Sequence, residues 1–158
     1  MARYSANVAS AAAVANNTMF AWIGYVAFYA KLRRVNVGVL NSGGAITSMQ
    51  VAVGLSVTTG AVVTPTNATV YSYSPGGLGP VNKVFLVNAY GTAPTIGAQT
   101  ADAFTIPFND QLMGDLPWEL MEELWVGGST SLGLAFVNRT GAALPAGHYF
   151  QLNVEWEE

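Results

Sequence analysis

The strongest constraint on the fold of this chain is an alternation of apolar and polar residues with a period of two. Residues 148–157 show it most clearly, because every second residue from Phe150 to Trp156 is large and apolar and those between are mostly polar. Such alternation is typical of a β-strand that buries one face. We therefore expect a final strand that lies centrally or buried in its sheet and turns one apolar row into a core.

Runs of the same kind recur along the chain and predict its architecture. They cover residues 35–39, 51–57, 69–73, 84–90, 104–108 and 132–136. Segments rich in Gly, Pro, Asn and Ser separate them and predict turns. Pro107 places the run 104–108 at a sheet edge or strand end, and the nearly continuous apolar run 84–90 is typical of a strand covered on both faces. Eight or nine strands at this spacing predict an all-β fold, a jelly-roll-like β-sandwich.

The length of 158 residues suits a single domain over 1–158, in which residues 1–18 could form an extended N-terminal arm. No charged residue lies between Arg3 and Lys31, which raises the question of a membrane or signal segment. The apolar run 19–30 has 12 residues, whereas a spanning helix needs about 20. We expect two strands joined by a turn at Asn16 and Asn17, and no membrane contact.

One segment, residues 115–125, departs from the alternation and predicts one short helix. Asp115 is a suitable capping residue, Pro117 suits the first turn, and the apolar residues would fill one arc of a helix over 116–125. The tryptophans of this helix would either cover an open edge of the sandwich or contact a partner. The candidate interface residues on it are Trp118, Met121 and Trp125.

Charge is the most unusual property of the composition. Only 9% of the residues are charged, against about 25% in an ordinary soluble domain. A surface with so few charges is poorly protected against association, so we expect an obligate oligomer. The net charge of −3 argues against a nucleic-acid partner bound through phosphate contacts.

Lys31, Arg33 and Arg34 form the main basic cluster, with Lys31 and Arg33 expected on one strand face and Arg34 on the other. Two interpretations stay open for them. Lys31 and Arg33 could pair with carboxylates of a neighbouring subunit, such as those at 155, 157 and 158, and would then be interface residues. Alternatively, the cluster is a solvated strand end.

The sequence offers little for catalysis. The absence of cysteine excludes disulfides, thiolate nucleophiles and cysteine-based zinc sites. His148, the one histidine, cannot supply a metal site that needs two, and its position on the inward row predicts a hydrogen-bonded structural side chain near the rim. No phosphate-binding loop or Gly-x-Ser-x-Gly motif occurs. We expect no catalytic residue, cofactor or metal, and hence no enzyme.

Three stretches of the sequence resemble small β-sandwich virion proteins of tailed bacteriophages, of the capsid decoration, cement or head-fibre type. The stretches are residues 2–8, residues 32–41 with 48–55, and residues 132–138 with the acidic end 153–158. The resemblance implies a structural role on the capsid surface, with assembly in the host cytoplasm and many copies per particle. It also implies a homo-oligomer, with a trimer favoured, and contact with the major capsid protein or another virion protein.

A carbohydrate-binding β-sandwich module of a phage or bacterial surface protein is the alternative. Tyr71, Tyr73, Trp118 and Trp125 could stack on sugar rings, although Tyr71 and Tyr73 also fit simple cross-strand pairing. A discrete trimer or a large shell would favour the virion protein. A clean monomer that adheres to polysaccharide would favour the module.

Overall fold

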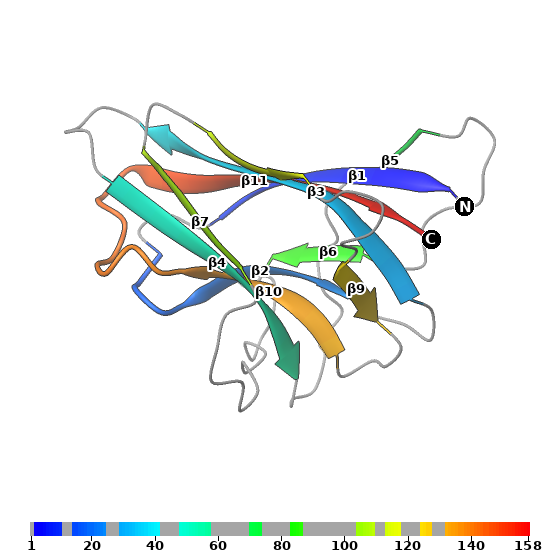
Figure 1. The fold of residues 1–158 in the computed structure, drawn as a ribbon. Coiled ribbons are helices and arrows are strands. Elements are labelled where there is room, and N and C mark those ends of the chain that lie inside the picture. Colours follow the sequence, from blue (N-terminus) through cyan, green and yellow to red (C-terminus); the bar gives the residue numbers. More distant parts are fainter. Residues whose placement is uncertain are drawn as a thin grey trace.

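The computed structural model describes residues 2–10, 14–24, 29–41, 48–57, 70–73, 83–86, 104–109, 113–117, 124–127 and 132–158. All regular elements in these ranges are β-strands, and every pairing between them is antiparallel (Figure 1). The all-β expectation is therefore confirmed for the described residues, with eleven strands in place of the eight or nine expected. None of these residues belongs to a helix able to cross a membrane.

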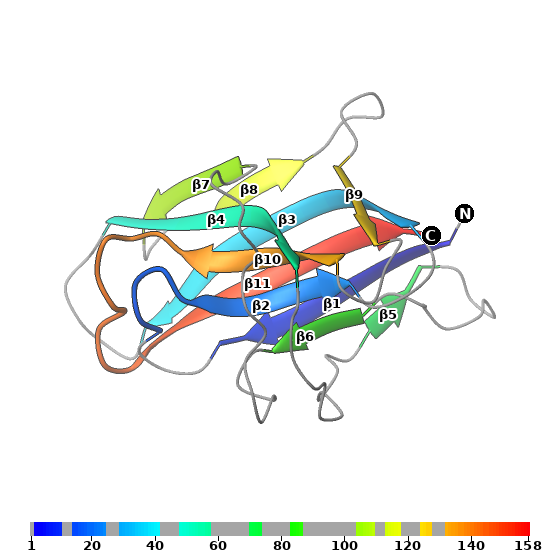
Figure 2. The ribbon, with the colours of Figure 1, turned by 90° about the horizontal axis from the view of Figure 1, so that it is seen from below.

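The strands form two sheets, which lie as two layers (Figure 1). The six-stranded sheet has the order β5 (Val70–Ser72), β1 (Arg3–Ala9), β11 (His148–Glu157), β3 (Tyr29–Asn41) and β8 (Gly114–Pro117), with β9 (Leu124–Gly127) also paired to β3. The five-stranded sheet has the order β6 (Lys83–Leu86), β2 (Met19–Gly24), β10 (Leu132–Asn138), β4 (Ser48–Val57) and β7 (Phe104–Asn109). From β1 to β4 the chain changes sheet at every connection. The edge strands β7 and β8 lie side by side on one flank of the molecule (Figure 2).

The core lies between the layers and is built on the inward row of β11. Phe150, Leu152, Val154 and Trp156 are all fully buried, as the alternation predicts. Phe20 of β2 stacks on Phe150 with ring centroids 4.6 Å apart, so side chains of the two sheets meet directly. β11 pairs with β1 on one side and β3 on the other, which confirms its central position.

A buried asparagine side chain connects a turn and a loop at one end of the molecule. The Asn138 side chain at the end of β10 donates to the carbonyl oxygens of Val14 at 2.9 Å and Ala142 at 3.1 Å, and accepts from the Thr140 N–H at 3.0 Å. It thereby joins the turn between β1 and β2 to the loop after β10. The turn expected at residues 16–17 is confirmed, and Asn17 has the positive φ of 58° that asparagine tolerates better than most residues.

A β-bulge in β3 changes the faces that the basic residues occupy. Glu155 is opposite Arg34 and Trp156 is opposite Leu32, so Arg33 is an extra residue in its strand. Leu32 and Val35 both point into the core. The two arginines between them both bind carboxylates on the opposite face of the sheet, which points away from the core. The expectation that Arg33 and Arg34 point to opposite faces is therefore wrong.

The prediction of a helix over 116–125 is also wrong, at both of its ends. Asp115, Leu116 and Pro117 belong to β8, and Leu124 and Trp125 belong to β9, while residues 118–123 lie outside the described residues. Pairing with β3 overrides the local helical pattern. Asp115, expected to cap a helix, instead accepts hydrogen bonds from Arg34 and Asn36 of β3.

The edge strands follow the sequence only in part. β7, which contains Pro107, lies at an edge of its sheet as predicted. The described part of the run 84–90 belongs to β6, at an edge of the five-stranded sheet, and its expected coverage on both faces stays a prediction. Residues 3–9, part of the segment considered for an N-terminal arm, pair with β5 and β11 inside the larger sheet.

Candidate functional site

The face of the six-stranded sheet that points away from the core is the candidate functional site, and we call it the outer face. Alternation along β11 places Tyr149, Gln151, Asn153, Glu155 and Glu157 on it. Cross-strand pairing brings neighbouring rows together. The row through Asn153, for example, runs from Asn7 of β1 through Asn36 of β3 to Asp115 of β8.

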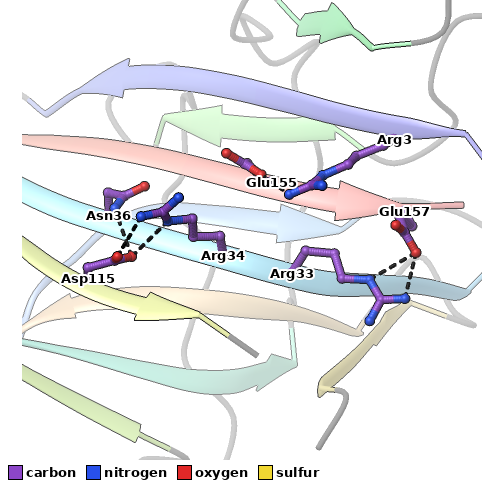
Figure 3. Close-up of polar contacts among 7 residues, drawn as sticks. All are labelled: Arg3, Arg33, Arg34, Asn36, Asp115, Glu155 and Glu157. Atoms are coloured by element: carbon purple, nitrogen blue, oxygen red, sulfur yellow. Dashed lines mark hydrogen bonds and ion pairs between the residues drawn. The ribbon is translucent and has the colours of Figure 1, made fainter. Parts of the chain in front are cut away.

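Three arginine–carboxylate pairs connect the strands across the outer face (Figure 3). Arg34 binds Asp115 through two parallel hydrogen bonds of 3.0 Å and 2.6 Å, and Asn36 donates to the same carboxylate at 2.8 Å. This arrangement links β3 to the edge strand β8, and its two-point geometry fixes the relative orientation of the two side chains.

The other two pairs bind β11 to its neighbours. Arg33 donates to one carboxylate oxygen of Glu157 at 2.9 Å and 2.6 Å, across the β3–β11 pair. Arg3 of β1 pairs with Glu155 of β11. Three cations and three anions thus neutralise one another, so that the outer face has several charged groups and little net charge from them.

The hydrogen bond from Arg34 holds the pKa of the Asp115 carboxyl below its usual value, although partial burial acts in the opposite direction. The same bond raises the pKa of Arg34. An exposed ion pair such as Arg34–Asp115 contributes about 0–1 kcal/mol to stability. This pair therefore affects the pattern of charge on the face more than the stability of the domain.

Two tyrosines lie at the β5 end of the outer face. Tyr71 is opposite Ser5 of β1, and its side chain is 65% exposed. Its ring meets that of Tyr73 edge to face, at 86° with centroids 5.4 Å apart. The guanidinium of Arg3 lies over the Tyr73 ring, 5.4 Å from its centroid. The expectation that both tyrosines lie on one side is confirmed.

Apolar side chains gather at the opposite end of the outer face. Leu40 of β3 is directly opposite Tyr149 of β11, and both are exposed. Met113, also exposed, lies against the position that a side chain on Gly38 would fill. The face therefore has an apolar end and a charged, aromatic end, with the row of asparagines between them.

The described part of the chain includes three of the five predicted interface residues. Lys31 of β3 is opposite both Trp125 of β9 and Glu157 of β11, and Glu157 binds Arg33. Three of the five predicted residues therefore lie around one end of β3. The pairing of Arg33 that was considered between subunits is made within the chain. Trp118 and Met121 lie outside the described residues.

His148 lies on the inward row, almost fully buried, as its position in the alternation predicts. Its Nδ1 is 3.3 Å from the carbonyl oxygen of Ala146, and its Nε2 is buried without a hydrogen-bond partner. Among the described residues, no cluster of three or more His, Asp or Glu side chains could hold a metal ion.

Sequence reasoning missed Asn138 as a structural centre. Its sequence context, Asn-Arg-Thr-Gly at a strand end, contained a signal, because asparagine in such a position favours a turn in which the side chain binds the backbone two residues later. Asn138 begins an Asn-x-Thr tripeptide of the glycosylation type. Its side chain is fully buried and hydrogen-bonded, so it is not accessible to modification in the folded chain.

No protein-family model matches the sequence, and no curated protein matches it.

Proposed function

We propose that the chain is a jelly-roll β-sandwich that serves as a structural virion protein, of the capsid decoration or cement type, and acts by burying its surface in an oligomer. The order of its strands is the observation that carries this proposal. A jelly roll of eight strands has sheet orders 1-8-3-6 and 2-7-4-5 when the strands are numbered along the chain. The orders β1-β11-β3-β8 and β2-β10-β4-β7 correspond to these once β5, β6 and β9 are set aside as additions.

A jelly-roll fold is compatible with a limited set of functions and does not by itself identify one of them. It is the architecture of viral capsid and lectin domains and of cupins, and a fold alone does not define an activity. The resemblance of residues 2–8, 32–41 and 132–138 to phage virion proteins favours the first of these groups.

The surface supports a role in assembly. The three arginine–carboxylate pairs on the outer face are made within the chain, so a partner can cover them without leaving any of these six charges unpaired. Lys31, Arg33 and Trp125, which the strand pairing places around one end of β3, are the proposed centre of contact, together with Trp118 and Met121. Repetition of modest contacts over a particle would supply stability through avidity.

Native mass spectrometry with sedimentation velocity at micromolar concentration tests the proposal. We expect a discrete oligomer of the 16.6 kDa chain, with a trimer favoured, or a larger shell. A stable monomer at high concentration would contradict it.

Trp118→Ala tests the proposed contact. Removing an interface tryptophan should weaken the oligomer by about 2 kcal/mol or more while the thermal midpoint of the dissociated chain stays unchanged. Tyr149→Ala, at the far end of the outer face, is the control and should leave assembly intact. Unfolding of the Trp118 variant without a change in assembly would exclude Trp118 from the interface.

A further inference from the structure

The tyrosine pair at the β5 end of the outer face has an ordered arrangement with one ring left open. Tyr73 is held by Arg3 on its face and by the ring of Tyr71 at 86°. Arg3 is held in turn by Glu155. Tyr71 is therefore supported by a neighbour that is itself fixed, and it remains 65% exposed. Stacking a ligand on Tyr71 would therefore cost little conformational entropy of the tyrosine side chain, which favours binding.

Polar groups continue from Tyr71 across the sheet. Ser5 of β1 is its direct cross-strand partner, and Glu155 of β11 is the next residue in the same row. Neighbouring strands are about 4.8 Å apart, so this row extends about 10 Å from β5. It presents an aromatic ring, then a hydroxyl, then a carboxylate that is hydrogen-bonded to a guanidinium.

We infer that this cluster, formed by Tyr71, Ser5, Arg3 and Glu155, is a binding site for a neutral sugar ring. A pyranose has one apolar C–H face, which would stack on Tyr71, and a rim of hydroxyls that both donate and accept hydrogen bonds. Ser5 and the Arg3–Glu155 pair supply acceptors and donors for that rim. Tyr73 is a positioning residue, because it orients Tyr71 and Arg3.

The geometry and charge select this class of ligand. The two rings are nearly perpendicular, so one ligand cannot stack on both of them, and the single C–H face of a puckered sugar ring suits the one open face of Tyr71. The guanidinium of Arg3 is already neutralised by Glu155, so an anionic sugar gains no unpaired cation. A neutral pyranose unit of a polysaccharide therefore suits the site better than a uronic acid or a nucleotide.

Affinity electrophoresis of the full chain tests this site. Native gels would contain neutral polysaccharides (laminarin, mannan, galactan and xylan) or the anionic polysaccharide alginate. We expect at least one neutral polysaccharide to retard the chain. Tyr71→Ala should raise the dissociation constant by at least about tenfold, which is the scale of one aromatic contact. Tyr71→Phe keeps the stacking ring and should keep most of the binding.

Tyr149→Ala is the matched control, because Tyr149 is an exposed tyrosine at the opposite end of the outer face. It should leave retardation unchanged, and the thermal midpoints of all variants should match that of the parent chain. The inference is overturned if no neutral polysaccharide retards the chain or if alginate alone does. It is also overturned if Tyr71→Ala and Tyr149→Ala lose binding equally. A loss of oligomer mass in Tyr71→Ala without any glycan binding would assign the cluster to a protein contact and also overturn it. Because assembly is measured separately, failure of the sugar site leaves the proposed virion role to its own test.

Discussion

Gly114 of β8 lies so close to Ile106 of β7 that no side chain fits between them. A Cβ built on Gly114 would lie 2.4 Å from the Ile106 Cγ2 atom, well inside van der Waals contact. β7 and β8 belong to different sheets, so this glycine lies at a close contact between the two layers. The glycine is required here by lack of space and not by backbone conformation, because its φ lies outside the left-handed region.

Gly114→Ala should therefore destabilise the domain. Overpacking of a core typically costs about 1–3 kcal/mol, and we expect an effect of this size in the free energy of unfolding measured with urea. Gly38→Ala on the adjacent strand β3 is the control. Its new Cβ would meet only the flexible and exposed Met113 side chain, at 3.2 Å. Equal effects of the two substitutions would show that the close approach to Ile106 is not what excludes a side chain.

Val154→Asp should abolish cooperative folding. Val154 is fully buried in the inward row of β11, and a carboxylate there would lose its hydration without gaining a partner. Gln151→Glu, at an exposed position on the outer face of the same strand, should change stability by less than about 0.5 kcal/mol. Thermal unfolding followed by circular dichroism distinguishes the two. Truncation before Asn153, which removes Val154 and Trp156, should likewise abolish soluble expression.

The sequence was informative where alternation was long and uninterrupted. The ten residues of β11 specify both their inward row and a central position, because a buried row of four large side chains needs neighbours on both sides. The placement of Tyr71 and Tyr73 on one side followed from the same parity. Register and sheet order did not, since they depend on which strands meet across long separations in sequence.

The helix over 116–125 shows why short patterns mislead. β8 and β9 have four residues each, too few for alternation to be distinguished from one turn of helix. Asp115 and Pro117 suit a helix start equally well as an edge strand. The deciding contacts come from Arg34 and Asn36 of β3, about 80 residues away in the sequence. The bulge at Arg33 was equally invisible, because a single extra residue reverses the parity of all that follow.

Asn138→Ala should cost about 1–3 kcal/mol, because it removes the hydrogen bonds of a fully buried side chain to the carbonyl oxygens of Val14 and Ala142, and leaves Val14 with its bond from the Leu144 N–H alone. The thermal midpoint measures the loss. Asn16→Ala in the same turn is the control, since Asn16 accepts only an exposed hydrogen bond from Gly141 at 3.1 Å and its loss should cost a few tenths of a kcal/mol. A stable Asn138 variant would contradict its role in joining the turn to the loop.

The Arg34–Asp115 pair should make a small, acid-sensitive contribution to stability. The pKa of Asp115 is lowered in the folded chain, chiefly by the hydrogen bond from Arg34. The folded state therefore binds a proton at Asp115 less readily than the unfolded state, and the stabilisation is fully present above the ordinary pKa of 3.8. It is lost as the pH falls through the lower pKa of the folded chain.

Unfolding in urea at pH values from 7 to 3 measures this contribution. Other carboxylates titrate in the same range, so the informative quantity is the difference in unfolding free energy between the parent chain and Asp115→Asn. We expect a difference below about 1 kcal/mol at pH 7, because both side chains are more than a third exposed, and a difference that shrinks toward pH 3. Arg34→Met should give a similar loss, and the double variant should lose little more than either alone, since both changes remove the same interaction. A difference that grows with acidity, or full additivity of the two changes, would show that the pair does not couple β3 to β8.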